Sequence, residues 1–172
     1  MGDYIFRHIY AGKFEQFSKV RQPSKDPRNL GIIHATFDMP DAFFDVWKRT
    51  ADKLDALFNG RVWLLVDNNT FSSAVGFAAM FRDYGVGKIV GYETGGVPVC
   101  FGDTYQFFLN NSGIECGVSC KQFFCSKPRP GDDEHGVLPD VPLCAELLAN
   151  FRGETDPVLA YTLSYIRQNP RP

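Results

Sequence analysis

The sequence predicts an α/β fold with a mainly parallel, buried sheet and flanking helices. The first observation is the run RVWLLVD at 61–67, where successive residues are apolar, as in a strand buried on both faces of a sheet. The second is a helix predicted over 74–84, followed by Gly85 where a left-handed residue commonly ends a helix. A short apolar strand follows at 88–93, and strand, helix and strand in this order form a right-handed crossover between parallel strands.

The remaining elements are predicted from apolar spacing and from turn residues. They are a strand at 31–37, a helix that opens at Asp38 and Pro40 and stops at Asn59-Gly60, strands at 104–110 and 114–125, and helices at 143–151 and from Asp156 to Ile166. Alternate apolar residues share one face of each middle strand, and we expect these two strands to form an irregular β segment. The residues on these faces are Tyr105, Phe107 and Leu109, then Ile114, Cys116, Val118 and Cys120.

Composition excludes several classes of protein. The 16 Phe, 7 Tyr and 2 Trp supply enough apolar surface for one domain of 172 residues to hold a core without disulfides. With 18 basic and 20 acidic residues the net charge is −2, which provides no basic surface for nucleic acid or an anionic membrane. No apolar stretch reaches the roughly 18 residues of a membrane-spanning helix. We therefore expect no nucleic-acid partner and no membrane span in this chain.

The five cysteines are an odd set, so at least one is unpaired unless it bonds another chain. Cys116, Cys120 and Cys125 lack the paired C-x-x-C spacing of structural zinc sites. We therefore interpret them as small buried apolar residues, because free cysteine is among the most buried residue types.

Ser72 and Ser73 are the most informative polar residues, because they lie between the predicted buried strand and the helix that follows it. A hydroxyl held on a rigid turn, beside the free N–H groups of a helix start, suits an acyl-transfer nucleophile. The alternative interpretation is a helix N-cap, for which serine is a preferred residue. The GxSxG elbow of the α/β-hydrolases is absent.

Ordered motifs surround this junction, from about Phe58 to the DPVLAYTL segment: TFSSA, IVGYETGG, FGD, GVSCKQFF and GVLPD. Together they resemble the tail-specific and tricorn-type serine peptidases, also called the C-terminal processing protease family. The resemblance implies a ClpP/crotonase-like core. It also implies that the parent protein is a serine endopeptidase that hydrolyses peptide bonds through an acyl-enzyme.

The resemblance assigns roles residue by residue. The family nucleophile falls on Ser72, and the backbone N–H of Ser73 becomes one oxyanion-hole donor. The lysine of the processing-protease branch falls on Val97, so a Ser–Lys dyad is not supported. The acidic member of the tricorn-type tetrad, which orients the base, falls on Asp133, with Glu134 one position later.

The tetrad's histidine and second serine, and the glycine-rich segment that donates the other oxyanion N–H, precede the matching region in the family. His8 and His34 lie upstream of Ser72 in no matching motif, and His135 is interpreted as an exposed loop residue. A serine hydroxyl without a base is a weak nucleophile. We therefore expect this chain alone to be inactive.

The resemblance also gives a domain division and an alternative. Residues 1–30 are an N-terminal partial segment or connector, and residues 31–172 are the C-terminal part of the peptidase catalytic domain. The alternative function is a non-catalytic peptide-binding or protein-interaction domain derived from a degenerate peptidase, in which the serine only caps the helix.

Substrate contacts are predicted at the TGG sequence, Thr94, Gly95 and Gly96, because the family's substrate chain can lie extended beside strands. The expected partner is a peptide or an unfolded protein, and self-association is left open. No metal or organic cofactor is implied. The resemblance points to an exported or cell-envelope bacterial protein.

Overall fold

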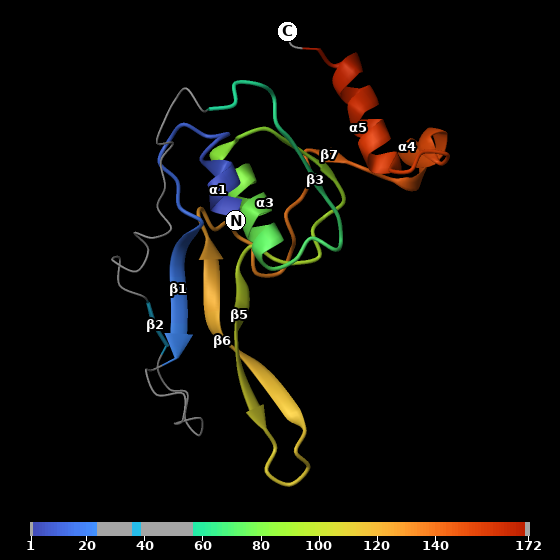
Figure 1. Ribbon diagram of the computed structural model, residues 1–172. Helices are drawn as coiled ribbons and strands as arrows, with labels where there is room; N and C mark the ends of the chain where they lie inside the picture. The colour runs from blue at the N-terminus through green and yellow to red at the C-terminus, as the bar shows by residue number, and fades with distance from the viewer. Residues whose placement is uncertain (1, 24–35, 39–56, 171–172) are drawn as a thin grey trace.

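The computed structural model describes residues 2–23, 36–38 and 57–170 (Figure 1). The first elements along the chain are α1 (Gly2–Phe6), β1 (Phe17–Pro23), β2 (Thr36–Asp38), β3 (Trp63–Val66), α3 (Ser73–Tyr84) and β4 (Lys88–Gly91). They are followed by β5 (Cys100–Phe108), β6 (Glu115–Cys125), β7 (Val141–Pro142), α4 (Ala145–Leu148), the 3₁₀ turn η2 (Ala149–Phe151) and α5 (Pro157–Gln168). The predicted helix between Pro40 and Asn59 and the predicted boundary at residues 30 and 31 lie outside, or largely outside, the described residues.

The predicted strand, helix and strand unit is confirmed. β3 and β4 pair in parallel, with Leu64 opposite Ile89 and Val66 opposite Gly91, and α3 connects them. β7 adds to the other edge of β4, also in parallel, to give the order β3-β4-β7. Gly85 ends α3 in the left-handed conformation, with φ of 62°.

A second sheet is antiparallel and has the order β2-β1-β6-β5. The prediction of a mainly parallel sheet is therefore wrong, because this sheet has more strands than the parallel one. β1 comes from the N-terminal segment and pairs with β6 about a hundred residues later, with Val20 opposite Phe123. The α/β class, the parallel unit and the β segment after it are retained from the predicted architecture.

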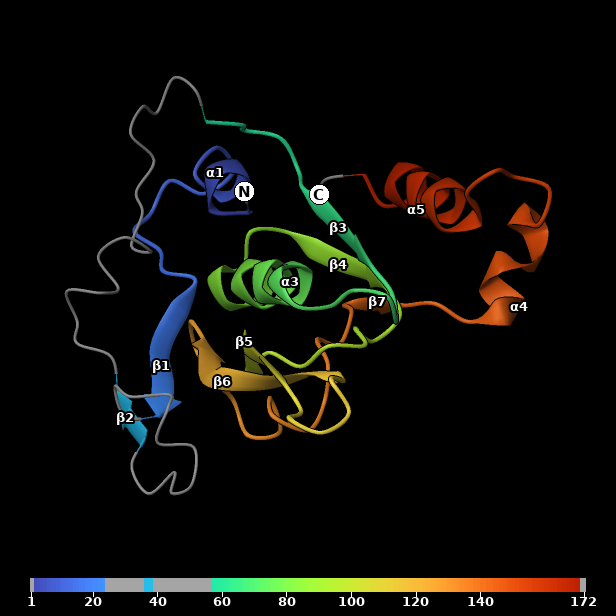
Figure 2. The same cartoon turned by 60° about the horizontal axis from the view of Figure 1, so that its bottom comes forward.

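α3 lies between the two sheets and contacts β3, β4 and β6 (Figure 2). Its residues Val75, Ala78 and Phe81 recur at helical spacing and are almost fully buried. They form the main core cluster with Val66, Ile89 and other residues of the sheets. α1 packs against the same helix, and its Phe6 is enclosed by a second cluster that contains Phe14 and Met80.

The strand predicted at 61–67 is buried on one face only. Val66 is buried, but the side chain of Leu65 is 37% exposed. α3 contacts the parallel sheet on one face. On β3, Trp63 packs on Tyr165 of α5 at 5.7 Å between ring centroids, while Leu65 stays partly exposed. An apolar run thus overstates burial where the second cover is incomplete.

The middle and C-terminal elements lie close to where the sequence predicts them, except that the helix predicted over 143–151 is α4 followed by the 3₁₀ turn η2. β5 and β6 are the two predicted strands and pair antiparallel, with Tyr105 opposite Val118. Cys125 is buried as interpreted, whereas Cys116 and Cys120 are only half-buried. α5 begins at Pro157, and the Asp156 side chain caps it by accepting a hydrogen bond from the N–H of Leu159. Among the described residues, no helix has both the length and the apolar composition needed to cross a bilayer.

The buried face of α3 makes a stability prediction. Replacing Phe81, which is 0% exposed in the main cluster, with alanine should lower the free energy of unfolding by about 3–5 kcal/mol because it leaves a cavity. Urea denaturation measures the change. Phe108→Ala, at a side chain that is 64% exposed, is the matched control and should change it by less than about 0.5 kcal/mol. Equal losses for the two variants would contradict the assigned core.

Candidate active site

Ser72 occupies a strained turn between β3 and α3. Its backbone has φ 53° and ψ −122°, a conformation that only glycine adopts without strain. Its side chain is exposed and makes no capping hydrogen bond to the helix. A non-glycine residue in this conformation costs of order 1–3 kcal/mol and persists only where the surrounding structure holds it. The position at the helix start was predicted, but the geometry does not fit an ordinary N-cap serine.

The N-terminus of α3 leaves backbone donors beside this serine. The N–H of Ala74 donates to the carbonyl oxygen of Phe71 at 3.0 Å. The N–H of Gly76 donates to the carbonyl oxygen of Ser72, also at 3.0 Å. Within the described chain, neither Ser72 nor Ser73 shows a hydrogen bond from its backbone N–H to a protein acceptor. The Ser73 N–H is therefore available to a ligand at the positive end of the helix dipole.

The segment before the serine is held by its own polar groups. The Asp67 carboxylate accepts from the N–H of Asn69 at 2.9 Å, and the Asp67 N–H donates to the Thr70 hydroxyl at 3.1 Å. The Thr70 N–H donates to the Asp67 carbonyl oxygen at 2.9 Å. These bonds form a tight turn at the end of β3, which fixes where the chain enters α3.

Ser72 and Ser73 line a cavity of about 1000 Å³ between the start of α3 and the start of β5. Most of its walls are apolar, including the side chains of Phe71, Val97 and Phe101. An apolar cavity with a few convergent polar groups is the usual form of a ligand site.

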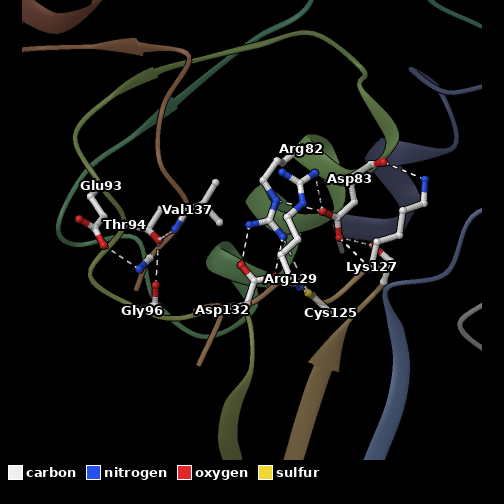
Figure 3. Close-up of polar contacts among 12 residues, drawn as sticks. Arg82, Asp83, Glu93, Thr94, Gly96, Cys125, Lys127, Arg129, Asp132 and Val137 are labelled. Carbon is white, nitrogen blue, oxygen red and sulfur yellow. Dashed lines mark hydrogen bonds and ion pairs between the residues drawn. The ribbon is translucent and has the colours of Figure 1, made fainter. Parts of the chain in front are cut away.

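Residues 94–99, here called the wall segment, run along one side of the cavity, and Gly95, Gly96, Val97 and Pro98 line it. Figure 3 shows the polar contacts of Thr94 and Gly96. The N–H of Gly96 donates to the carbonyl oxygen of Thr70 at 3.0 Å, which ties the wall segment to the turn before Ser72. A Cβ on Gly95 would lie 2.0 Å from the carbonyl oxygen of Asn68, so only glycine permits this approach. Gly95 and Gly96 line the cavity, and their role as substrate contacts stays a prediction.

Thr94, the third predicted contact, is buried and does not line the cavity. Its hydroxyl donates to the carbonyl oxygen of Gly96 at 2.8 Å and accepts from the N–H of Val137 at 2.8 Å. The Thr94 side chain therefore shapes the wall segment from behind, and its hydroxyl already has two partners.

The chain matches a known protein family. The profile of peptidase family S41 matches residues 11–143, which is more than half of the chain. The chain belongs to peptidase family S41. A search of curated proteins finds no match. S41 peptidases are serine-type hydrolases, and relatives of the C-terminal processing proteases are among them, as the sequence motifs predicted.

Solved structures support the fold. A protein described as a peptidase from Parabacteroides merdae has a TM-score of 0.60 at 14% identity, over 98% of this chain and 48% of its own. A protein described as an S41 protease from Bacteroides fragilis has a TM-score of 0.55 at 15% identity, over 98% and 41%. Mature CPAF complexed with lactacystin has a TM-score of 0.50 at 21% identity, over 67% and 21%. This chain thus spans about half or less of the length of these structures.

Of the residues that received family roles by resemblance, some line the cavity and others do not. Val97 lines it, so the position of the processing-protease lysine faces the same cavity as Ser72 but carries an apolar side chain. Asp133 and Glu134 are exposed and lie outside the cavity lining. Their neighbour Asp132 is the buried carboxylate of this loop, at 6% exposure. The role predicted for Asp133 stays a prediction.

The described lining of the S41 cavity contains no histidine and no lysine. Its ionisable side chains are Cys100 and Asp103, and burial raises the pKa of the Cys100 thiol. The described residues also contain no cluster of metal-binding side chains. The cavity therefore offers a hydroxyl and backbone donors, and none of its described lining groups is a nitrogen base.

Asp103 is a feature of the S41 cavity that sequence reasoning missed. Within the described residues, it and Ser72 are the only non-glycine residues with positive φ, and both line the cavity. Asp103 has φ 57° and pairs with Lys121 at 2.5 Å. The FGD motif includes Asp103, but the residue type does not predict a positive φ at this position.

The strained turn makes a stability prediction. Ser72→Gly should raise the free energy of unfolding by about 1 kcal/mol, because relief of backbone strain exceeds the entropy cost of glycine. Ser73→Gly, one residue later in α3, is the matched control and should lower it by about 0.5–1 kcal/mol. Chemical denaturation measures both. A loss of stability in Ser72→Gly as large as that in Ser73→Gly would show that the turn is not strained.

Proposed function

We propose that this chain provides the nucleophile, one oxyanion donor and a substrate wall of a serine peptidase that acts through an acyl-enzyme on Ser72. The observation that carries the proposal is the strained, exposed Ser72 at the mouth of an apolar cavity, next to the free N–H of Ser73. Stored backbone strain at an exposed hydroxyl is characteristic of nucleophiles on strand-to-helix turns.

The chemistry follows from this geometry. The Ser72 oxygen bonds to the carbonyl carbon of the substrate, and its proton passes to a base. The carbonyl oxygen then carries negative charge, which the Ser73 N–H and the helix dipole stabilise. Collapse of this intermediate breaks the C–N bond, the amine leaves with a proton, and water hydrolyses the remaining ester.

Substrate recognition is assigned to the wall segment and the apolar lining. Gly95 and Gly96 line the cavity, so an extended peptide would lie beside their backbone. The apolar lining accommodates a substrate side chain without an opposing charge, which suits a peptide or an unfolded protein as the substrate. In this proposal Asp133 orients the base from the loop behind the wall segment, as the family pattern predicts.

The proposal predicts that a base must be added before the isolated chain reacts. With a fluorophosphonate probe the Ser72 oxygen bonds to phosphorus, fluoride leaves, and the hydroxyl proton needs an acceptor. We expect labelling of the chain to be slow in buffer and to rise at least about tenfold when imidazole is supplied as the base. Peptide mass spectrometry should locate the adduct on Ser72.

Two serine variants complete this test. Ser72→Ala should abolish labelling, whereas Ser73→Ala should retain it because the backbone N–H of residue 73 remains. Fast labelling without imidazole would show that the chain already contains a working base. No labelling of Ser72 under either condition, together with binding of unfolded peptides, would favour the non-catalytic peptide-binding alternative.

A further inference from the structure

A buried ion pair joins the C-terminal end of α3 to the loop behind the cavity. Arg82 donates to both carboxylate oxygens of Asp132, at 2.8 and 2.9 Å (Figure 3). The Arg82 side chain is 15% exposed and that of Asp132 is 7% exposed. Two parallel hydrogen bonds between planar groups fix direction as well as distance.

The pKa values of both groups reflect this contact. Burial alone would lower the pKa of the Arg82 guanidinium, but Asp132 and Asp83 raise it above its ordinary value. Burial alone would raise the pKa of the Asp132 carboxyl, but hydrogen bonds from Arg82 and from the Arg129 N–H lower it. Both groups are therefore charged at neutral pH.

Residues 125–137, here called the clamp loop, are tied to α3 at a second point through Asp83. The Asp83 side chain is fully buried and accepts from the Ser126 hydroxyl at 2.9 Å and from the Lys127 N–H at 3.0 Å. The Lys127 ammonium donates to the Asp83 carbonyl oxygen at 2.8 Å. The first part of the clamp loop is thus attached to the helix through Asp83, whose carboxylate also accepts from the Arg82 Nε at 2.9 Å.

The clamp loop holds the wall segment at both ends. The N–H of Val99 donates to the carbonyl oxygen of Asp132 at 2.8 Å. At the other end, Thr94 and Val137 are joined by a backbone bond of 3.2 Å and by the Thr94 hydroxyl. Between these points, Gly96 is bonded to the turn before Ser72. One chain of contacts therefore runs from Arg82 through Asp132 and Val99 to the cavity wall.

We propose that Arg82 and Asp132 are positioning residues that set the place of the wall segment relative to Ser72. Neither side chain lines the cavity, so they act only through the clamp loop. A buried ion pair adds little net stability, because the loss of hydration offsets the attraction between the charges. The pair instead fixes the position of the clamp loop relative to α3. Ser72 and Arg82 lie at opposite ends of this one rigid helix. The expected effect on the reactivity of Ser72 rests on the proposed function, whereas the position of the wall segment can be measured separately.

The test uses the double variant Arg82→Met/Asp132→Asn in the full chain. Removing both members leaves neither of them as an unpaired charge. Asp83 loses its bond from Arg82 but keeps Arg129 at 3.4 Å and the donors of Ser126 and Lys127, so the variant is expected to fold. With imidazole present, fluorophosphonate labelling of Ser72 should fall at least about tenfold. Amide hydrogen exchange should quicken at Val99 by at least about tenfold and should be unchanged at Val90 in the core strand β4.

The controls separate positioning from loss of stability. Thr162→Ala removes a buried hydroxyl that donates to the Val158 carbonyl oxygen in α5, away from the cavity. It should lower the unfolding midpoint but leave labelling and Val99 exchange within twofold of the original chain. Arg82→Lys keeps the charge without the paired bonds, so its labelling should lie between those of the original and the double variant.

The outcomes are distinguishable. Unchanged Val99 exchange, or labelling of the double variant within twofold of the original, would overturn the positioning role. Equal acceleration at Val99 and Val90 would also overturn it, because that result means general destabilisation. If Ser72 is labelled in no variant, the proposed function fails, and the exchange of Val99 still decides whether the ion pair positions the wall segment.

Discussion

The packing of α3 between the two sheets is the interaction on which the rest of the structure depends. Val75, Ala78 and Phe81 bury one side of the helix against β3 and β4, and this fixes the position of both helix ends. The N-terminal end presents Ser72 and the free N–H of Ser73, and the C-terminal end carries Arg82. A shift of α3 would therefore move the candidate nucleophile and the anchor of the clamp loop together.

Strain and polar contacts are concentrated around this helix. Ser72 is held at a positive φ by the turn of Asp67 and Thr70 on one side and by α3 on the other. The wall segment reaches the same turn through Gly96 and is held from behind by the clamp loop. The cavity is thus formed by parts of the chain that are far apart in sequence but bonded in one network, which gives the preorganisation that acyl transfer requires.

Local patterns predicted the local structure. Helical spacing and Gly85 predicted α3, Asp156 and Pro157 predicted the start of α5, and the junction predicted a serine on the turn before α3. The pairing of β1 with β6 was missed, because it joins segments about a hundred residues apart and the aromatic residues of the N-terminal segment have no clean period. The positive φ of Ser72 was missed because tertiary contacts, and not residue type, impose it. In the acidic loop, sequence similarity selected Asp133, whereas the buried neighbour Asp132 became apparent only with its partner Arg82.

The most direct test of the central claim is a crystal structure of the chain with a peptidyl boronate. A boronate accepts a serine oxygen to form a tetrahedral adduct that imitates the charged intermediate, and the hydroxyl proton is released to solvent. The account predicts density joining boron to the Ser72 oxygen, with a boronate oxygen within about 3 Å of the Ser73 N–H and the peptide against Gly95 and Gly96. A boronate bound elsewhere, or in the cavity without a bond to Ser72, would contradict it.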